Sequence, residues 1–176
     1  ILLQDKPQYR PFIESRLQEF AQEANPKAPI FSLLADQVRK NPKNLDVSRL
    51  LVEYALPAGY AVSAIQVLVN QTNKLHENNS SLLKIASYCL GKQVFSTAAA
   101  AYEILIDQTT NSSNLRSRAL LGLARSKEGL TRADEANRIY LDLIQHYPHH
   151  PEADEAHYRL GLLMQETDHQ AALQIF

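Results

Sequence analysis

A short motif recurs along this sequence: an alanine followed four positions later by an aromatic residue. It occurs at Ala98–Tyr102, Ala136–Tyr140 and Ala172–Phe176, and a fainter copy that ends in leucine occurs at Ala64–Leu68. The successive copies are 34, 38 and 36 residues apart. A period of this length is typical of stacked helical repeats, in which each unit buries its apolar face against its neighbours. The sequence therefore predicts a repeat array, an architecture that usually serves as a binding scaffold.

Composition and the breaks between apolar segments predict that the chain is made of helices. Only 5 of the 176 residues are Gly, and the helix-forming residues Ala, Leu, Gln, Glu and Arg recur throughout. No segment alternates apolar and polar residues as a strand would, and no hairpin signal is present. We expect an all-α fold with helices over about 8–24, 30–40, 45–56, 60–73, 80–91, 94–108, 113–127, 131–147, 152–166 and from 168 onward.

Proline and glycine punctuate these expected helices. Pro57 and Gly59 separate two of them. Gly129 is expected to end the helix over 113–127, because glycine tolerates the left-handed conformation of a helix cap. Thr131, followed three residues later by Asp134, has the pattern of a capping box that opens the next helix. These signals predict helix pairs joined by short turns.

A second set of small residues is expected where the two helices of a pair cross. Ala86, Gly122 and Gly161 each follow an aliphatic residue in the expected first helices. The alanines of the recurring motif supply the small residue of the second helix, and the bulky residue one turn later fills the space beside it. Two facing small residues let the backbones approach closely, so a leucine at either position would overpack the contact by about 1–3 kcal/mol.

These residues resemble the tetratricopeptide repeat. That family pairs an aliphatic–small dipeptide in the first helix with an alanine about twelve residues later, an aromatic residue four beyond, and a proline at the end of the repeat. The matching sets are Ile85-Ala86 with Ala98 and Tyr102, Leu121-Gly122 with Ala136, Tyr140 and Pro148, Leu160-Gly161 with Ala172 and Phe176, and a weaker set of Leu51-Val52 with Ala64 and Leu68. The chain has no Trp, so it lacks the tryptophan of the family pattern and resembles a divergent member.

The resemblance implies a superhelical array of antiparallel helix pairs, an α-solenoid, over residues 44–176. The expected repeats cover about 45–78, 79–112, 113–150 and 151–176, and the last of them stops within its second helix. Residues 1–43 fit the period poorly and are expected to form N-terminal helices that act as an atypical or capping repeat. We expect this sequence to be a segment of a larger protein. Self-association through the incomplete C-terminal repeat is also expected, because terminal repeats expose an apolar face.

No catalytic or cofactor-binding motif is recognisable. The sequence has no Gly-rich phosphate loop, nucleophile elbow or kinase signature. Cys89 is expected to be a buried structural thiol, because it falls on the inward face of its expected helix with Leu82, Ile85 and Ala86. His146, His149, His150 and His157 are clustered, but they lack the spacing of a metal site and are expected to be polar surface residues. The sequence predicts a protein that is not an enzyme and has no cofactor and no metal.

The charge and apolar patterns restrict the class of partner. A formal net charge of −1 gives no basic surface of the kind that binds nucleic acid. No stretch approaches the roughly 20 apolar residues that a membrane span needs, so no membrane insertion is expected in this segment. A protein or peptide partner remains the expectation.

In tetratricopeptide repeats the first helices line a concave face, and the resemblance places the partner-binding groove there. The candidates in the matched register are Leu83, Ser87, Leu90, Arg116, Ala119, Leu123, Lys127, Glu155, Tyr158, Leu162 and Gln165. Each leucine has the alternative role of packing against the next repeat. Leu83 and Ser87 stand where the family's chaperone-tail receptors carry Lys and Asn, so a clamp for a terminal carboxylate is not expected. An apolar groove with a few charges suits an extended or helical peptide instead.

The expected function is therefore that of a protein-interaction scaffold within a larger protein. Residues 147–161 look like the linkers in tetratricopeptide repeat proteins of the bacterial cell envelope. Examples are the lipoprotein of the outer-membrane β-barrel assembly machinery and the coordinator of the Tol–Pal system. This similarity favours a bacterial periplasm or cell envelope over the cytoplasm. The alternative is a non-catalytic regulatory or substrate-presenting domain of a larger enzyme.

Overall fold

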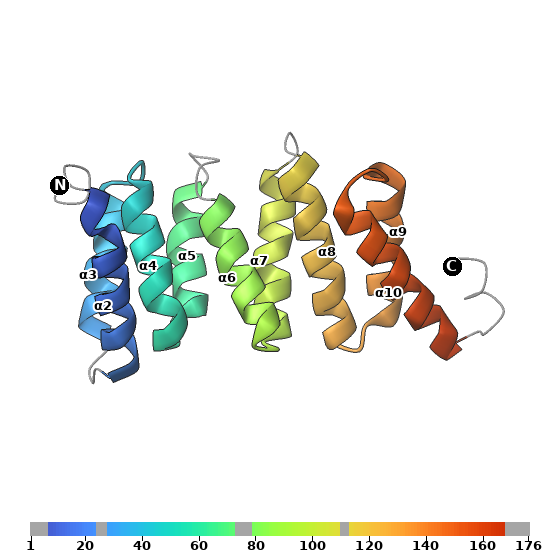
Figure 1. Cartoon of the computed structure of the whole chain (residues 1–176), viewed down its shortest axis with the longest axis horizontal. Coiled ribbons are helices and arrows are strands. Elements are labelled where there is room, and N and C mark those ends of the chain that lie inside the picture. Colours follow the sequence, from blue (N-terminus) through green and yellow to red (C-terminus); the bar gives the residue numbers. More distant parts are fainter. Residues whose placement is uncertain (1–6, 24–27, 73–78, 110–112, 168–176) are drawn as a thin grey trace. The chain divides into compact units, whose positions relative to one another are not determined.

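The computed structural model describes residues 7–23, 28–72, 79–109 and 113–167, and every regular element in these ranges is helical (Figure 1). The elements are the 3-10 helix η1 (Pro7–Tyr9) and the α-helices α2 (Arg10–Glu23), α3 (Ala28–Lys40), α4 (Leu45–Ala58), α5 (Ala61–Thr72), α6 (Asn79–Gly91), α7 (Phe95–Gln108), α8 (Ser113–Gly129), α9 (Ala133–His146) and α10 (Pro151–Thr167). The all-α prediction is confirmed, and the expected helix ends fall within two residues of the observed ones. The helix expected from 168 onward lies outside the described residues.

The chain divides into two compact units, Ile1–Ile85 and Ala86–Phe176, which are described separately. In the first unit, α2 and α3 pack against α4, and α5 packs against α3 and α4. In the second unit, α8 packs against α7 and α9, and α10 contacts both α8 and α9. Within each unit, successive helices run in opposite directions beside one another (Figure 1). This is the packing of a helical-repeat array.

The turn between the two helices of a pair is built in the same way at three places. Gly59, Gln93 and Thr131 have positive φ values of 86°, 59° and 59°, and each lies five residues before an alanine of the recurring motif. In every case this residue's N–H donates to the carbonyl three residues earlier, and the next N–H donates to the carbonyl five residues before itself. These are the hydrogen bonds of a Schellman-type helix end. The same backbone turn therefore recurs with the sequence motif. It also precedes the fainter copy of the motif at Ala64.

Two predictions about the turn before α9 are wrong. Gly129 does not cap α8 in the left-handed conformation; it is the last residue of that helix, and Thr131 has the positive φ instead. Thr131 and Asp134 do not form a capping box, because the residue before α9 is Arg132 and no side chain bonds to this helix end. The backbone hydrogen bonds of the repeated turn satisfy the helix ends here, so side-chain capping is not required.

The alanines and aromatic residues of the recurring motif lie in the core. Ala64, Ala98 and Ala136 are fully buried, and Tyr102 and Tyr140 are 3% and 0% exposed. In the second unit, Ala136, Tyr140 and Leu143 of α9 pack with residues of α8 and α10 in one cluster, whose other members are Leu120, Ala124, Ala156 and Leu160. One face of α9 thus fills the space between two first helices. The last copy of the motif, Ala172–Phe176, lies outside the described residues.

Gly122 of α8 has a different neighbour from the one that the sequence predicted. We expected it to face the small residue of its own second helix, but the nearest atoms to a Cβ at this position belong to the ring of Tyr102 on α7. They lie 2.2–2.6 Å from that Cβ position, where a side-chain atom has no room. The aromatic residue of one repeat therefore occupies the place of a side chain on the first helix of the next repeat.

Candidate functional site

The candidates lie on the first helices α6, α8 and α10, but the structure divides them into buried, bonded and exposed side chains. Leu83 and Leu123 are each 7% exposed, so they offer little surface to a partner. Leu90 is half-buried, whereas Ser87 is exposed and its hydroxyl lies 3.3 Å from the hydroxyl of Tyr102. These positions contribute to packing within the array.

Arg116 and Lys127, both on α8, are already engaged with neighbouring helices. The Arg116 guanidinium donates to the backbone carbonyl of Ile106 in the last turn of α7. A cation at a helix C-terminus satisfies a carbonyl that has no partner within the helix and interacts favourably with the helix dipole.

Lys127 of α8 forms ion pairs with residues of both neighbouring helices, α7 and α9. Its ammonium lies 3.1 Å from Glu103 of α7 and 3.0 Å from Glu135 of α9, and its side chain is only 12% exposed. Hydrogen bonds to the two carboxylates raise the pKa of Lys127. The same contact lowers the pKa of the Glu135 carboxyl. Lys127 thus stays charged and holds α8 between its two neighbours, a role that leaves it few donors for a ligand.

A network of charged side chains joins α8 to α10. Glu155 lies 2.9 Å from Arg159 and 3.4 Å from Arg125, and Arg159 lies 3.3 Å from Glu128. The hydroxyl of the buried Tyr140 donates to Glu128 at 2.8 Å. Burial and the nearby Glu128 carboxylate raise the pKa of Tyr140.

Sequence reasoning found only Glu155 in this network. The i, i+4 spacing of Glu155 and Arg159 was a visible signal of a helical ion pair. The contacts from Arg125 and Glu128 across to α10 depend on how the two helices pack, and the sequence carries no local signal for them. The network holds the surface between α8 and α10 in a defined arrangement of charges.

Two candidates on α10 are exposed beside this network. Tyr158 is 57% exposed and Leu162 is 40% exposed. They lie one helical turn apart, and Glu155 lies one turn before Tyr158, so the three side chains share a face. This face combines an aromatic ring, an aliphatic side chain and a carboxylate, and we call it the α10 face.

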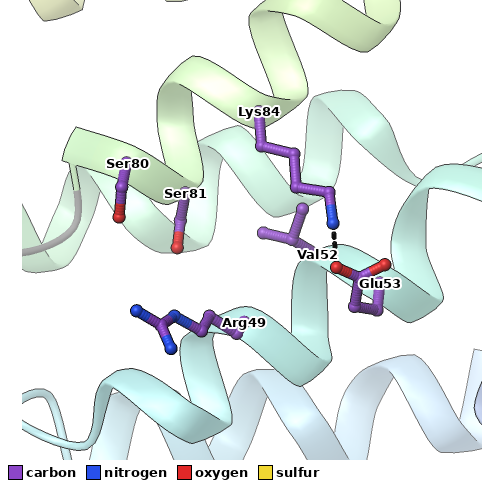
Figure 2. Close-up of a pocket in the computed structure, with 6 residues that line it drawn as sticks. All are labelled: Arg49, Val52, Glu53, Ser80, Ser81 and Lys84. Atoms are coloured by element: carbon purple, nitrogen blue, oxygen red, sulfur yellow. Dashed lines mark hydrogen bonds and ion pairs between the residues drawn. The ribbon is translucent and has the colours of Figure 1, made fainter. Parts of the chain in front are cut away.

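The first unit contains a polar pocket that sequence reasoning missed. Arg49, Val52 and Glu53 of α4 and Ser80, Ser81 and Lys84 of α6 line a cavity of about 230 Å³ (Figure 2). Figure 2 shows the two serine hydroxyls directed toward the space in which the Arg49 guanidinium lies. Lys84 forms an ion pair with Glu53 at the other end of the pocket. The serines look in the sequence like ordinary residues at a helix start, so no local signal identifies them.

The cysteine and histidine predictions have mixed outcomes. Cys89 is 2% exposed, as expected, and burial raises the pKa of its thiol. His146, His149 and His157 are exposed, but His150 is half-buried, contrary to the prediction of a surface residue. Its Nδ1 lies 3.3 Å from the Ser117 hydroxyl, and its ring meets that of Tyr147 edge-on.

No group of three or more His, Cys, Asp or Glu side chains within the described ranges is arranged to hold a metal ion. None of the helices that the structure describes combines the length and the apolar character needed to cross a bilayer.

The helix pair of α8 and α9 matches a known protein family. The family model of the tetratricopeptide repeat matches residues 118–150. The match covers most of α8 and all of α9, with the turn that contains Thr131. Tetratricopeptide repeats generally mediate protein–protein interactions. No curated protein and no solved structure matches the chain.

Proposed function

We propose that this tetratricopeptide repeat chain binds a segment of a partner polypeptide, and that the α10 face is a principal contact surface. The observation that carries the proposal is the exposure of Tyr158 and Leu162 beside Glu155. Aromatic and aliphatic side chains supply most of the binding energy in peptide grooves, and charged groups at the rim select the partner. An amphipathic helix or an extended segment with a basic residue opposite Glu155 fits this surface.

The ion-pair network supports this proposal because it orders the surroundings of the exposed side chains. Arg159 is held by Glu155 on its own helix and by Glu128 on α8. A partner that docks on an ordered surface loses less conformational entropy than one that must order it. The network therefore favours specific recognition.

The context of the scaffold forms part of the same proposal. The similarity of residues 147–161 to linkers of bacterial envelope proteins supports a role in an envelope assembly, as part of a larger protein. Self-association through the C-terminal repeat is a further hypothesis, in which a second copy of the chain covers the α10 face. A regulatory or substrate-presenting domain of a larger enzyme would use the same binding surface, and the sequence of the full-length protein separates these contexts.

Affinity capture with paired variants tests the proposal. Leu141 of α9 is 53% exposed and lies on a second helix, so Leu141→Glu is a matched control for Tyr158→Glu and Leu162→Glu. We expect the two α10 variants to reduce recovery of the partner by about tenfold or more, the effect typical of a single hot-spot residue. Equal loss with Leu141→Glu, or no loss with either α10 variant, would refute the assignment of the surface.

A parallel measurement separates a foreign partner from a second copy of the chain. Light scattering at several concentrations reports self-association of the unmodified protein. If the protein forms oligomers that Tyr158→Glu dissociates, the α10 face binds another copy. A monomer at all concentrations, together with loss of capture in the α10 variants, assigns the face to a different protein.

A further inference from the structure

The pocket between α4 and α6 in the first unit has a cation without a counter-ion. Arg49 makes no ion pair or hydrogen bond with any residue that the structure describes, although its guanidinium carries five donors. Both oxygens of Glu53 are occupied, one by the Lys84 ammonium and the other by the Gln18 amide at 3.2 Å. Because Lys84 and Glu53 neutralise each other, the pocket keeps the positive charge of Arg49.

The opposite wall of the pocket is the N-terminus of α6. In a helix of 13 residues that begins at Asn79, the first N–H groups have no partner inside the helix and carry the positive end of the helix dipole. These groups belong to the turn that contains Ser80 and Ser81. A helix N-terminus is a favourable place for an anion because N–H donors and dipole act together.

Ser81 provides an independent indication of a ligand. Its side chain lines the pocket and is directed into it, yet the residue is only 6% exposed (Figure 2). Its hydroxyl makes no hydrogen bond with another residue among those described. The hydroxyl therefore has a donor to offer to a group bound in the pocket.

We propose that this pocket binds a phosphoryl group. The donors that converge on it are the Arg49 guanidinium, the hydroxyls of Ser80 and Ser81, and the N–H groups at the start of α6. A phosphoryl group has three strongly accepting oxygens and about two negative charges near neutral pH, which match this donor set better than the two oxygens of a carboxylate. The volume of about 230 Å³ lies below the roughly 300–1,000 Å³ of sites for whole small molecules. The pocket therefore holds a free phosphate or the phosphorylated side chain of a polypeptide.

Binding of two phosphate compounds to the full chain tests this proposal. Inorganic phosphate and O-phosphoserine are titrated in separate experiments at constant ionic strength, with acetate as a carboxylate control, and binding is measured by calorimetry and phosphorus NMR. We expect saturable binding of at least one phosphate compound and no competition by acetate. Inorganic phosphate alone identifies a free anion as the ligand, whereas tighter binding of phosphoserine identifies a modified side chain.

Four variants, one of them a control, connect this binding to the pocket. Arg49→Gln and Ser81→Ala should each weaken binding by about tenfold, since each removes a hydrogen bond to a charged ligand. Arg118→Gln removes an exposed arginine from α8 in the other unit and should leave binding unchanged. Glu53→Gln should strengthen binding, because it removes the carboxylate that lines the pocket and releases Lys84. A tighter affinity in Glu53→Gln could not result from a loss of protein stability, so this variant tests the pocket independently of folding.

Several outcomes would overturn the proposal. These are the absence of saturable binding for both phosphate compounds, equal binding of acetate, or the same affinity in Arg49→Gln and the unmodified protein. The α10 face lies in the other unit and is tested by other variants, so failure here leaves the proposed function intact.

Discussion

Substitution of Gly122 by alanine tests the packing between consecutive repeats. The added Cβ would lie 2.2, 2.4 and 2.6 Å from three atoms of the Tyr102 ring, whereas ordinary van der Waals contact begins near 3.4 Å. The ring would have to retreat by about 1 Å. It has little freedom to do so, because Tyr102 is 3% exposed and its hydroxyl lies beside that of Ser87.

The expected loss follows from two opposing effects. Overpacking of a buried contact costs about 1–3 kcal/mol. Alanine in a helix interior gains about 1 kcal/mol over glycine. Because the clash is with a buried ring, we take the upper part of the range and expect Gly122→Ala to lower the free energy of unfolding by about 1–2 kcal/mol.

Gly91 provides a matched control. It ends α6, and no atom lies within 4 Å of its Cβ position. Gly91→Ala should therefore be neutral or should stabilise the protein by about 0.5 kcal/mol. Urea unfolding measures the free energies. Hydrogen exchange of α7 and α8 measures the local effect, because repeats can open separately.

A double variant shows whether the Tyr102 ring is responsible. Tyr102→Leu removes the ring atoms, so adding Gly122→Ala to this background should cost at least about 1 kcal/mol less than it costs alone. Equal stability of Gly122→Ala and Gly91→Ala, or additive effects in the double variant, would refute the packing argument.

Further predictions concern the repeated turn and the buried tyrosine. Thr131→Gly should stabilise the protein by about 0.5–1 kcal/mol, because a β-branched residue at positive φ is strained and glycine is not. Gly59→Ala should destabilise it by about 1 kcal/mol for the same reason, and thermal midpoints that move in the opposite directions would contradict this account. Tyr140→Phe should cost about 1 kcal/mol near pH 7, because Glu128 loses its hydrogen-bond donor. Since the pKa of Tyr140 is raised in the folded state, the folded protein holds a proton that the unfolded chain releases above about pH 10. Stability should therefore fall as the pH rises through this region, and urea unfolding at several alkaline pH values should show a smaller fall for Tyr140→Phe.

The helices and their period could be predicted because their causes are local. Ala98 and Tyr102 recur with Ala136 and Tyr140 at a spacing that only a repeat architecture explains, and the structure buries all four. Proline, glycine and apolar spacing act within a few residues, so the helix ends were predicted to within two positions.

The sequence predicted the candidate site less completely than the fold. The repeat register predicted that Tyr158 and Leu162 lie on a first helix, and both are exposed there. The role of Lys127 was missed, since its two carboxylate partners come from α7 and α9. The pocket of Arg49 and Ser81 was also missed, because its walls come from two helices, α4 and α6, that are not consecutive in the chain.

The sequence by itself determined an all-α chain with a repeat of 34 to 38 residues, because helix propensity and apolar periodicity are properties of neighbouring residues. Only the tertiary structure decided that Tyr102 covers Gly122, that Gln93 and Thr131 adopt left-handed turns, and that Arg49 remains without a counter-ion in the part of the chain that is described. The contact of Tyr102 with Gly122 and the surroundings of Arg49 depend on packing between helices, whereas the turns at Gln93 and Thr131 are local but lack the glycine that would mark them in the sequence.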